Sequence, residues 1–219
     1  MTISLPPAKE RLILLTLAGI QFSHIVDFMM MMPLGPMLTQ SLGIGPAAFG
    51  LLVSAYTFSA GASGLLATTY IDRFDRKRLM LVMFGLFALF TLLCGLAPNF
   101  VLLMAARMGA GFFGGILNAM TQTIVADVIP FERRGRAMGV VMTSFAVGTV
   151  AGVPTALVLA NHWGWPAPFV VLAGISVGLW GLAAVTLPVL NRHTQAVREQ
   201  KGWTVIARTI RDNNHQRAL

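Results

Sequence analysis

The chain has 219 residues, of which 56% are hydrophobic and 11% charged, whereas an average soluble domain is about 25% charged. This composition excludes an ordinary soluble domain. The net charge of +8 would suit nucleic acid, but the basic residues form short clusters between long apolar runs instead of one basic face, so we exclude nucleic-acid binding as well.

Six apolar stretches are each long enough to cross a lipid bilayer as a helix, since about 20 residues span its hydrocarbon core. Helix is expected because backbone amides in hydrocarbon need partners within their own segment. We therefore predict an all-α membrane protein: an N-terminal segment 1–11, a six-helix bundle over 12–190 and a basic tail over 191–219. The predicted spans are 12–37, 47–71, 79–97, 100–126, 137–160 and 166–190.

The loops between these spans alternate in basic residues. Lys9 and Arg11 precede the first span, and further Lys and Arg follow the second, fourth and sixth, whereas loops 38–46, 98–99 and 161–165 contain neither. Because cytosolic loops carry the excess of Lys and Arg, we expect both ends of the chain in the cytosol.

Two full charges, Asp27 and Arg107, lie well inside predicted spans. An ionisable side chain at membrane depth costs about 2.5–3.5 kcal/mol on insertion scales, so it is normally paired or placed beside water. Both residues lie at similar depths from the same membrane face, so they can pair. Our hypothesis is that Asp27 takes up and releases a proton, in a balance set by desolvation and by Arg107.

Polar and small residues form a stripe on each of these two helices, at steps of three and four residues. Such stripes face a cavity or another helix, and simple hydrogen bonding between helices remains an alternative for Gln21, Asn118 and Gln122. His24 either relays protons to Asp27 or is a neutral packed histidine. The stripes consist of Gln21, His24 and Asp27 in the first span and Arg107, Gly111, Gly114, Asn118 and Gln122 in the fourth.

Cofactor chemistry has little support in the sequence. Cys94 is the single cysteine and lies in an apolar run, so neither an internal disulfide nor a thiolate metal site can form. We predict no cofactor and no bound metal. The methionine run 29–32 could offer an adaptable wall to a lipophilic cation, or it could simply face lipid.

The connection after the second span carries a family resemblance. Its charged residues Asp72, Arg73 and Arg76 are similar to the Gly-x-Leu-Ala-Asp-Arg-x-Gly-Arg-Lys signature of the major facilitator superfamily, with Thr68 and Asp75 in place of its glycines. The segment around Asp127, Arg133 and Arg134 resembles the partner loop after the fourth helix. The resemblance implies a cytosolic latch of carboxylates and guanidinium groups.

Two further motifs agree with this family. Arg107 with Gly109 and Gly111 looks like its fourth-helix motif, in which the arginine faces the cavity and is tied to proton coupling. The fifth span resembles the antiporter motif of drug and metabolite exporters, although close helix packing also explains glycines four residues apart. The residues of that motif are Gly139, Gly148, Gly152 and Pro154.

The resemblance implies half of a twelve-helix fold, built as a 3+3 inverted repeat. Within the superfamily the chain resembles bacterial arabinose or multidrug efflux permeases, which implies proton-coupled efflux of a small molecule by alternating access in the bacterial inner membrane. The partners would be the substrate, protons, the lipid bilayer, and either a missing C-terminal half or a second copy. We thus expect a truncated half-transporter.

Two other functions stay open. A structural or regulatory membrane subunit, or an inactive fragment, would also fit a lone half. The segment 61–64, where Ser63 stands in a Gly-x-Ser-Gly pattern, suggests an intramembrane serine protease. Such a serine needs a histidine on a facing helix to activate it, and the only histidine inside a predicted span is His24. We expect no enzymatic activity.

Overall fold

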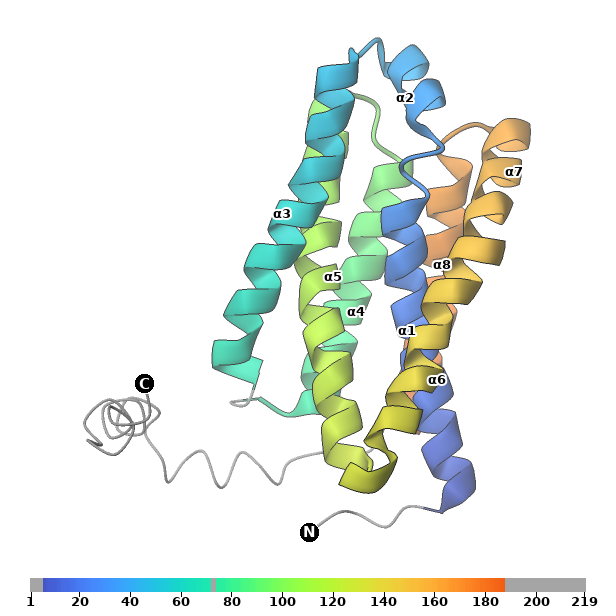
Figure 1. Cartoon of the computed structure of the whole chain (residues 1–219). Coiled ribbons are helices and arrows are strands. Elements are labelled where there is room, and N and C mark those ends of the chain that lie inside the picture. The colour runs from blue at the N-terminus through green and yellow to red at the C-terminus, as the bar shows by residue number, and fades with distance from the viewer. Residues whose placement is uncertain (1–5, 72–73, 188–219) are drawn as a thin grey trace, which may run out of the picture.

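The computed structural model describes residues 6–71 and 74–187, and within these ranges all regular structure is helical. The helices form one upright bundle (Figure 1). We call the end that carries α2 the α2 end, and the opposite end, where α1 and α4 begin, the Arg76 end. The elements are α1 (Pro7–Met29), α2 (Gly35–Leu42), α3 (Pro46–Tyr70), α4 (Arg76–Gly95), α5 (Phe100–Val128), a 3-10 turn (Phe131–Arg133), α6 (Arg134–Val147), a π turn (Gly148–Gly152), α7 (Val153–Trp163) and α8 (Ala167–Thr186).

Six helical spans in the described part of the chain are long and apolar enough to cross a membrane. Five are α1, α3, α4, α5 and α8, and the sixth is the continuous run from the 3-10 turn through α6, the π turn and α7. The predicted all-α membrane protein with six spans is confirmed. The predicted tail 191–219 lies outside the described residues.

The first span ends earlier than predicted. α1 stops at Met29, and the chain turns before α2 begins at Gly35, so the segment predicted as a loop contains a helix of its own. Pro33 explains the break, because it has no N–H to donate to the Met29 carbonyl and its ring would clash with that turn. α2 ends at Leu42 and is followed by its C-cap Gly43, whose φ of 63° suits glycine.

α4 begins three residues before the predicted third span. The Asp75 side chain accepts a hydrogen bond from the Arg78 N–H at 2.7 Å and so caps the helix. Arg76, Lys77 and Arg78 therefore form the first turn of α4 instead of a loop. At the α2 end, Asn99 caps α5 in the same way, through a 3.0 Å bond from the Leu102 N–H.

The fifth span changes its helical winding halfway. Gly148–Gly152 form a π turn directly before α7, whose second residue, Pro154, cannot donate a backbone hydrogen bond. The π turn thus lies where Pro154 interrupts the hydrogen bonding of this helix.

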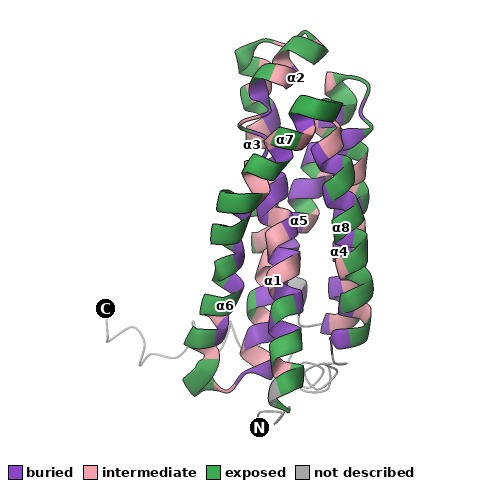
Figure 2. Ribbon diagram, turned by 90° about the vertical axis from the view of Figure 1, so that its right-hand side faces the viewer, coloured by how far each residue is buried: buried purple, intermediate pink, exposed green. Residues whose placement is uncertain are grey.

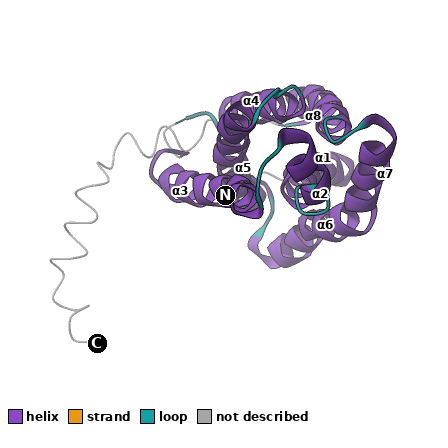
Figure 3. Cartoon of the chain, turned by 90° about the horizontal axis from the view of Figure 1, so that it is seen from above, coloured by secondary structure: helices purple, strands orange, loops and turns teal. Residues whose placement is uncertain are grey.

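The packing of the helices repeats itself within the bundle. α1 packs against α6, the π turn and α8, and α5 packs correspondingly against α3 and α4; α4 and α8 contact each other, as do α1 and α5. If the first three spans are exchanged with the last three, most of these helix–helix contacts are replaced by equivalent contacts, as an inverted repeat requires. Seen from above, α1 and α5 are flanked by α3 on one side and by α6 and α7 on the other (Figure 3).

The outer surface of the bundle is apolar. Val185 is 85% exposed and Phe58 77%, and Figure 2 shows exposed residues along the full length of the outer helices. A soluble protein rarely exposes so extended an apolar surface. Lipid is the solvent that suits it.

Candidate functional site

The two charges predicted at membrane depth form an ion pair between α1 and α5. Arg107 Nη1 donates to Asp27 Oδ2 at 2.9 Å and to the Asp27 backbone carbonyl at 3.2 Å. Both side chains are 0% exposed. The predicted pairing is confirmed, and the pair lies between the two helices that each begin one of the repeats.

Aromatic side chains cover the guanidinium group of this pair. The Arg107 Cζ atom lies 4.2 Å from the centroid of the Tyr56 ring, which is a cation–π contact. The Phe28 ring stacks on the Tyr56 ring, with 5.6 Å between their centroids. Tyr56 reaches the pair from α3 and was not among the residues predicted from the sequence.

Several buried polar atoms around the pair have no hydrogen-bond partner within residues 6–71 and 74–187. They are Asp27 Oδ1, Arg107 Nε and Nη2, Tyr56 Oη, His24 Nδ1 and Thr91 Oγ1. Thr91 and Cys94 from α4 lie next to the pair, Thr91 beside Asp27 and Cys94 beside Arg107. Because each unpartnered buried group costs about 1–3 kcal/mol, this cluster is not arranged for maximum stability.

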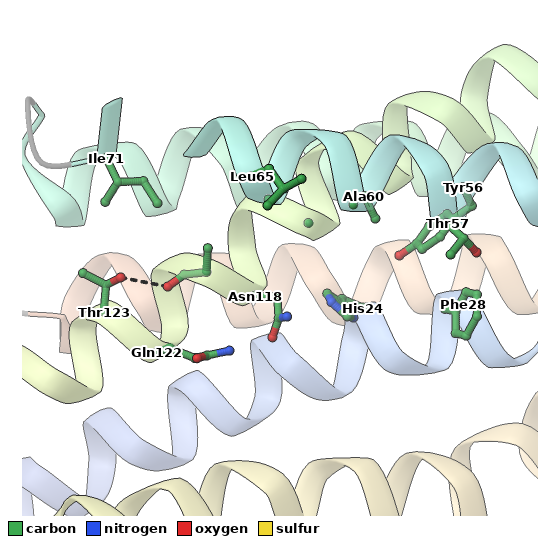
Figure 4. Close-up of a pocket in the computed structure, with 14 residues that line it drawn as sticks. His24, Phe28, Tyr56, Thr57, Ala60, Leu65, Ile71, Asn118, Gln122 and Thr123 are labelled. Atoms are coloured by element: carbon green, nitrogen blue, oxygen red, sulfur yellow. Dashed lines mark hydrogen bonds between the residues drawn. The ribbon is translucent and has the colours of Figure 1, made fainter. Parts of the chain in front are cut away.

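A groove of about 940 Å³ lies in front of the pair, between α1, α3 and α5 (Figure 4). Its polar lining consists of uncharged side chains, and most of the remaining lining is apolar or aromatic. Asp27 and Arg107 do not line it, whereas Tyr56 and Phe28 do. The polar lining residues are His24, Thr57, Asn118, Gln122 and Thr123.

The other predicted stripe residues lie where the periodicity placed them. Gln21 Nε2 donates to Asn118 Oδ1 at 3.2 Å, so these two side chains join α1 to α5 as the packing alternative supposed. Asn118 also lines the groove together with His24 and Gln122, and the Gln122 side chain is exposed. None of residues 29–32 lines this groove: Met30 and Met31 are buried in the core, and Met32 is 63% exposed.

A second charged cluster lies at the Arg76 end. Arg76 Nη1 donates to Asp127 Oδ2 in a close ion pair and to the Thr123 carbonyl at 3.4 Å, which joins α4 to the last turns of α5. Arg133 Nη2 donates to Glu10 Oε2 at 3.1 Å and so ties the start of α1 to the turn after α5. Asp72 and Arg73 lie outside the described residues.

Arg134 contacts the C-terminal end of α5. Its Nε donates to the Ile129 carbonyl at 3.1 Å and its Nη2 to the Ala126 carbonyl at 2.5 Å. These are carbonyls at the C-terminal end of α5, where orphan acceptors and a negative partial charge attract cations. Arg134 therefore caps α5.

A sequence model of the Major Facilitator Superfamily matches residues 17–216. The chain belongs to this superfamily. An uncharacterized MFS-type transporter of Mycobacterium tuberculosis is 32% identical over 174 residues, which cover 78% of this chain and 30% of that protein. A probable sugar efflux transporter of Helicobacter pylori (strain P12) is 28% identical over 153 residues, or 70% of this chain and 39% of that protein. The chain thus spans well under half the length of these relatives.

Solved transporters of the superfamily share the fold. The proton:xylose symporter XylE, bound to 6-bromo-6-deoxy-D-glucose, superposes with a TM-score of 0.74 at 14% identity, over 94% of this chain and 50% of that one. A bacterial homolog of the human lysosomal transporter Spinster, in an inward-facing conformation, gives 0.73 at 18% identity, over 85% and 44%. Each match covers about half of a full superfamily transporter.

The superfamily motifs rich in glycine correspond to close helix contacts in this chain. A side chain at Gly111 or Gly115 would collide with the α3 backbone at Tyr56 or Ala60. At Gly152, an added Cβ would lie 2.5 Å from a Val26 methyl on α1. The glycines thus let α3 approach α5 and the π turn approach α1, which confirms the packing interpretation.

Gly139 and Pro154, the other two members of the antiporter-like motif, make no such approach. Nothing lies within 4 Å of a Cβ added at Gly139, and Pro154 is exposed.

Ser63, the candidate protease nucleophile, is buried and donates to the Ala60 carbonyl at 3.1 Å. Its side chain also faces Gly115, so Ser63 belongs to the α3–α5 contact.

Proposed function

We propose that this chain forms one six-helix unit of a secondary transporter, which moves a small molecule across the membrane by alternating access. The observation that carries the proposal is the fully buried Asp27–Arg107 pair directly behind an uncharged polar groove. A buried ion pair contributes little net stability, because desolvation offsets most of the attraction. Its retention at membrane depth, with several unpartnered polar atoms around it, favours a functional use.

Proton coupling is the use we assign to the pair. A proton on Asp27 would remove the charge that holds the Arg107 guanidinium and so weaken the contact between α1 and α5. Loss of the proton would restore the contact. Since these are the first helices of the two repeats, such a change can favour one conformation of the bundle over another. His24, one turn from Asp27 on the groove wall, is placed to pass the proton on.

The substrate class we favour is a small neutral molecule with several hydroxyl groups, such as a sugar. The described groove lining contains amide, hydroxyl and imidazole groups and two aromatic rings, but no carboxylate that would attract a cation. The Helicobacter pylori relative is named for sugar efflux, and the structural neighbour XylE for proton-coupled xylose transport. We propose efflux as the direction of transport, because this sequence relative is named for sugar efflux.

The Arg76–Asp127 pair is proposed as part of a latch at the Arg76 end. An arginine–carboxylate contact is directional and can be broken by a small helix displacement. We place this end on the cytosolic side of a bacterial inner membrane, because the loops at this end carry the basic residues. The described cations Arg76, Arg133 and Arg134 all gather there.

A second six-helix unit, in the same polypeptide or another one, would cover the groove. Exposed polar side chains such as Gln122 border it, and lipid would leave them without hydrogen-bond partners. Transporters of this kind bind their substrate at the interface of two such units, near mid-membrane. Blue-native electrophoresis in mild detergent tests whether the chain associates.

Transport into inverted membrane vesicles tests the whole proposal. Vesicles from cells that produce the protein, with an acidic interior, should accumulate labelled pentose or hexose, and Asp27→Asn should abolish this accumulation. Gly174→Ala is the matched control, because nothing lies within 4 Å of a Cβ added there. Gradient-driven accumulation that Asp27→Asn leaves intact would overturn the proton coupling. An absence of any sugar accumulation above empty-vector vesicles would favour a structural or regulatory subunit instead.

A further inference from the structure

Tyr56 occupies the boundary between the groove and the buried ion pair. Its ring lines the groove, and the Arg107 guanidinium carbon lies 4.2 Å from the ring centroid. The side chain is nevertheless only 3% exposed, and Asp27 and Arg107 behind it are at 0%. Figure 4 shows Tyr56 reaching across from α3 toward Phe28 on α1. The stacked rings of Tyr56 and Phe28 close this side of the cluster.

The Tyr56 hydroxyl gains nothing from this position. It is buried, and no hydrogen-bond partner for it exists within the described residues. A phenylalanine would fill the same space without the cost of desolvating a hydroxyl group. A tyrosine is therefore useful only if its side chain also takes a second position. The groove offers one, because its polar lining includes Asn118, one turn from Gly114 on α5, and it has room for water.

The glycine stripe on α5 accommodates the closed position. α5 comes so near the Tyr56 backbone that only glycine fits at position 111. A Cβ added at Gly114 would lie 2.9 Å from the Tyr56 hydroxyl oxygen, and the same Cβ would be 3.6 Å from His24 Cδ2. Gly114 thus leaves the space that the hydroxyl fills when the ring covers the pair.

We propose that Tyr56 is the barrier between the groove and the Asp27–Arg107 pair: its ring holds Arg107 against Asp27 and excludes water, and its outward movement admits water to Asp27. The inference rests on the proposed function, in which Asp27 must exchange protons with water. In that mechanism Tyr56 is a positioning residue, because it acts through Arg107 and through access to Asp27.

Cys94 provides a native reporter of water access to the pair. It is the single cysteine of the chain, is 0% exposed and lies beside Arg107, on the side that α4 contributes. Its rate of modification by 2-aminoethyl methanethiosulfonate, measured on the full chain in membranes, requires no transport. The result therefore stays interpretable even if the transport assay fails.

Removing the ring should open the path, and removing only the hydroxyl should not. Tyr56→Ala should raise the modification rate of Cys94 at least about ten-fold, since such access is governed by local opening. Tyr56→Phe should stay within about two-fold of the unmodified protein, because the ring that excludes water remains. Phe84→Ala removes an equally buried ring of α4, ten residues from Cys94, and controls for general loosening of the core.

A paired substitution separates the barrier from simple loss of packing. Gly114→Ala keeps the tyrosine but displaces its hydroxyl, and should also expose Cys94. Adding Tyr56→Phe to Gly114→Ala removes the colliding oxygen and should return the rate to that of the unmodified protein. This rescue is not expected if Gly114→Ala merely disrupts the bundle.

Three results would overturn the proposal. The first is a Cys94 rate in Tyr56→Ala equal to that of the unmodified protein. The second is an equal increase in Phe84→Ala, which would make the effect one of general loosening. The third is a Gly114→Ala increase that Tyr56→Phe fails to reverse. If Tyr56→Ala does not fold, the Gly114→Ala pair decides alone.

Discussion

Removing either member of the Asp27–Arg107 pair should destabilise the protein, and the two losses should be unequal. Asp27→Leu leaves the guanidinium, 0% exposed, without its carboxylate. Arginine keeps its charge at any working pH, so this variant should lose about 3–5 kcal/mol. Arg107→Met leaves a carboxyl group that can bind a proton and become neutral, and its loss should be about 1–3 kcal/mol.

The double variant Asp27→Leu/Arg107→Met distinguishes coupling from simple packing. With both charges gone, no charge is left buried, so its stability should lie within about 1 kcal/mol of the unmodified protein. It should nonetheless be inactive in transport. Summed independent losses would instead give about 4–8 kcal/mol, so the two expectations are far apart.

Thermal unfolding in detergent measures these differences. The buried Cys94 becomes accessible on unfolding and can be followed with a fluorogenic maleimide, while circular dichroism gives an independent readout. At about 2–4 °C per kcal/mol for a chain of this size, Asp27→Leu should lower the apparent Tm by about 6–20 °C and the double variant by at most about 4 °C. A double variant that loses as much as the two singles together would refute the coupling.

Further variants test the remaining contacts. Asp127→Asn should weaken transport several-fold while membrane insertion, measured by protease protection, stays intact; unchanged transport would remove the latch. Gly111→Ala should destabilise the protein by about 1–3 kcal/mol, because α3 and α5 must separate, and Gly174→Ala should not; equal thermal shifts would contradict the packing assignment. Ser63→Ala should leave transport unchanged, and the unmodified protein should not react with a fluorophosphonate probe, whereas labelling at Ser63 would support a protease.

The ion pair could be predicted from sequence because its signal is energetic. A charge inside an apolar span is costly, and Asp27 and Arg107 are two such charges at the same depth. Helical periodicity then placed Gln21, His24, Asn118 and Gln122 on the faces around them. The six spans followed from hydropathy for the same reason, since a membrane constrains backbone more strongly than water does.

Tyr56 could not be predicted in the same way, because its role depends on a contact between α3 and α5. The signal in the sequence was weak. Tyr56 is one of two tyrosines in the chain and lies at membrane depth, where its hydroxyl group needs a hydrogen-bond partner. The end of α1 was misplaced because hydropathy does not register Pro33. The bonds of Arg134 to the end of α5 could not be predicted, because a basic loop does not reveal which carbonyls a helix end leaves free.

Aqueous accessibility of the groove wall tests the central claim most directly, namely that the buried pair borders a wet path across the membrane. In a Cys94→Ala background, His24→Cys and Asn118→Cys should react with a membrane-impermeant methanethiosulfonate, added to intact cells or to inverted vesicles, and a change of pH should shift the side from which they react. Cysteines at both positions that are sealed from water on both sides would contradict the account.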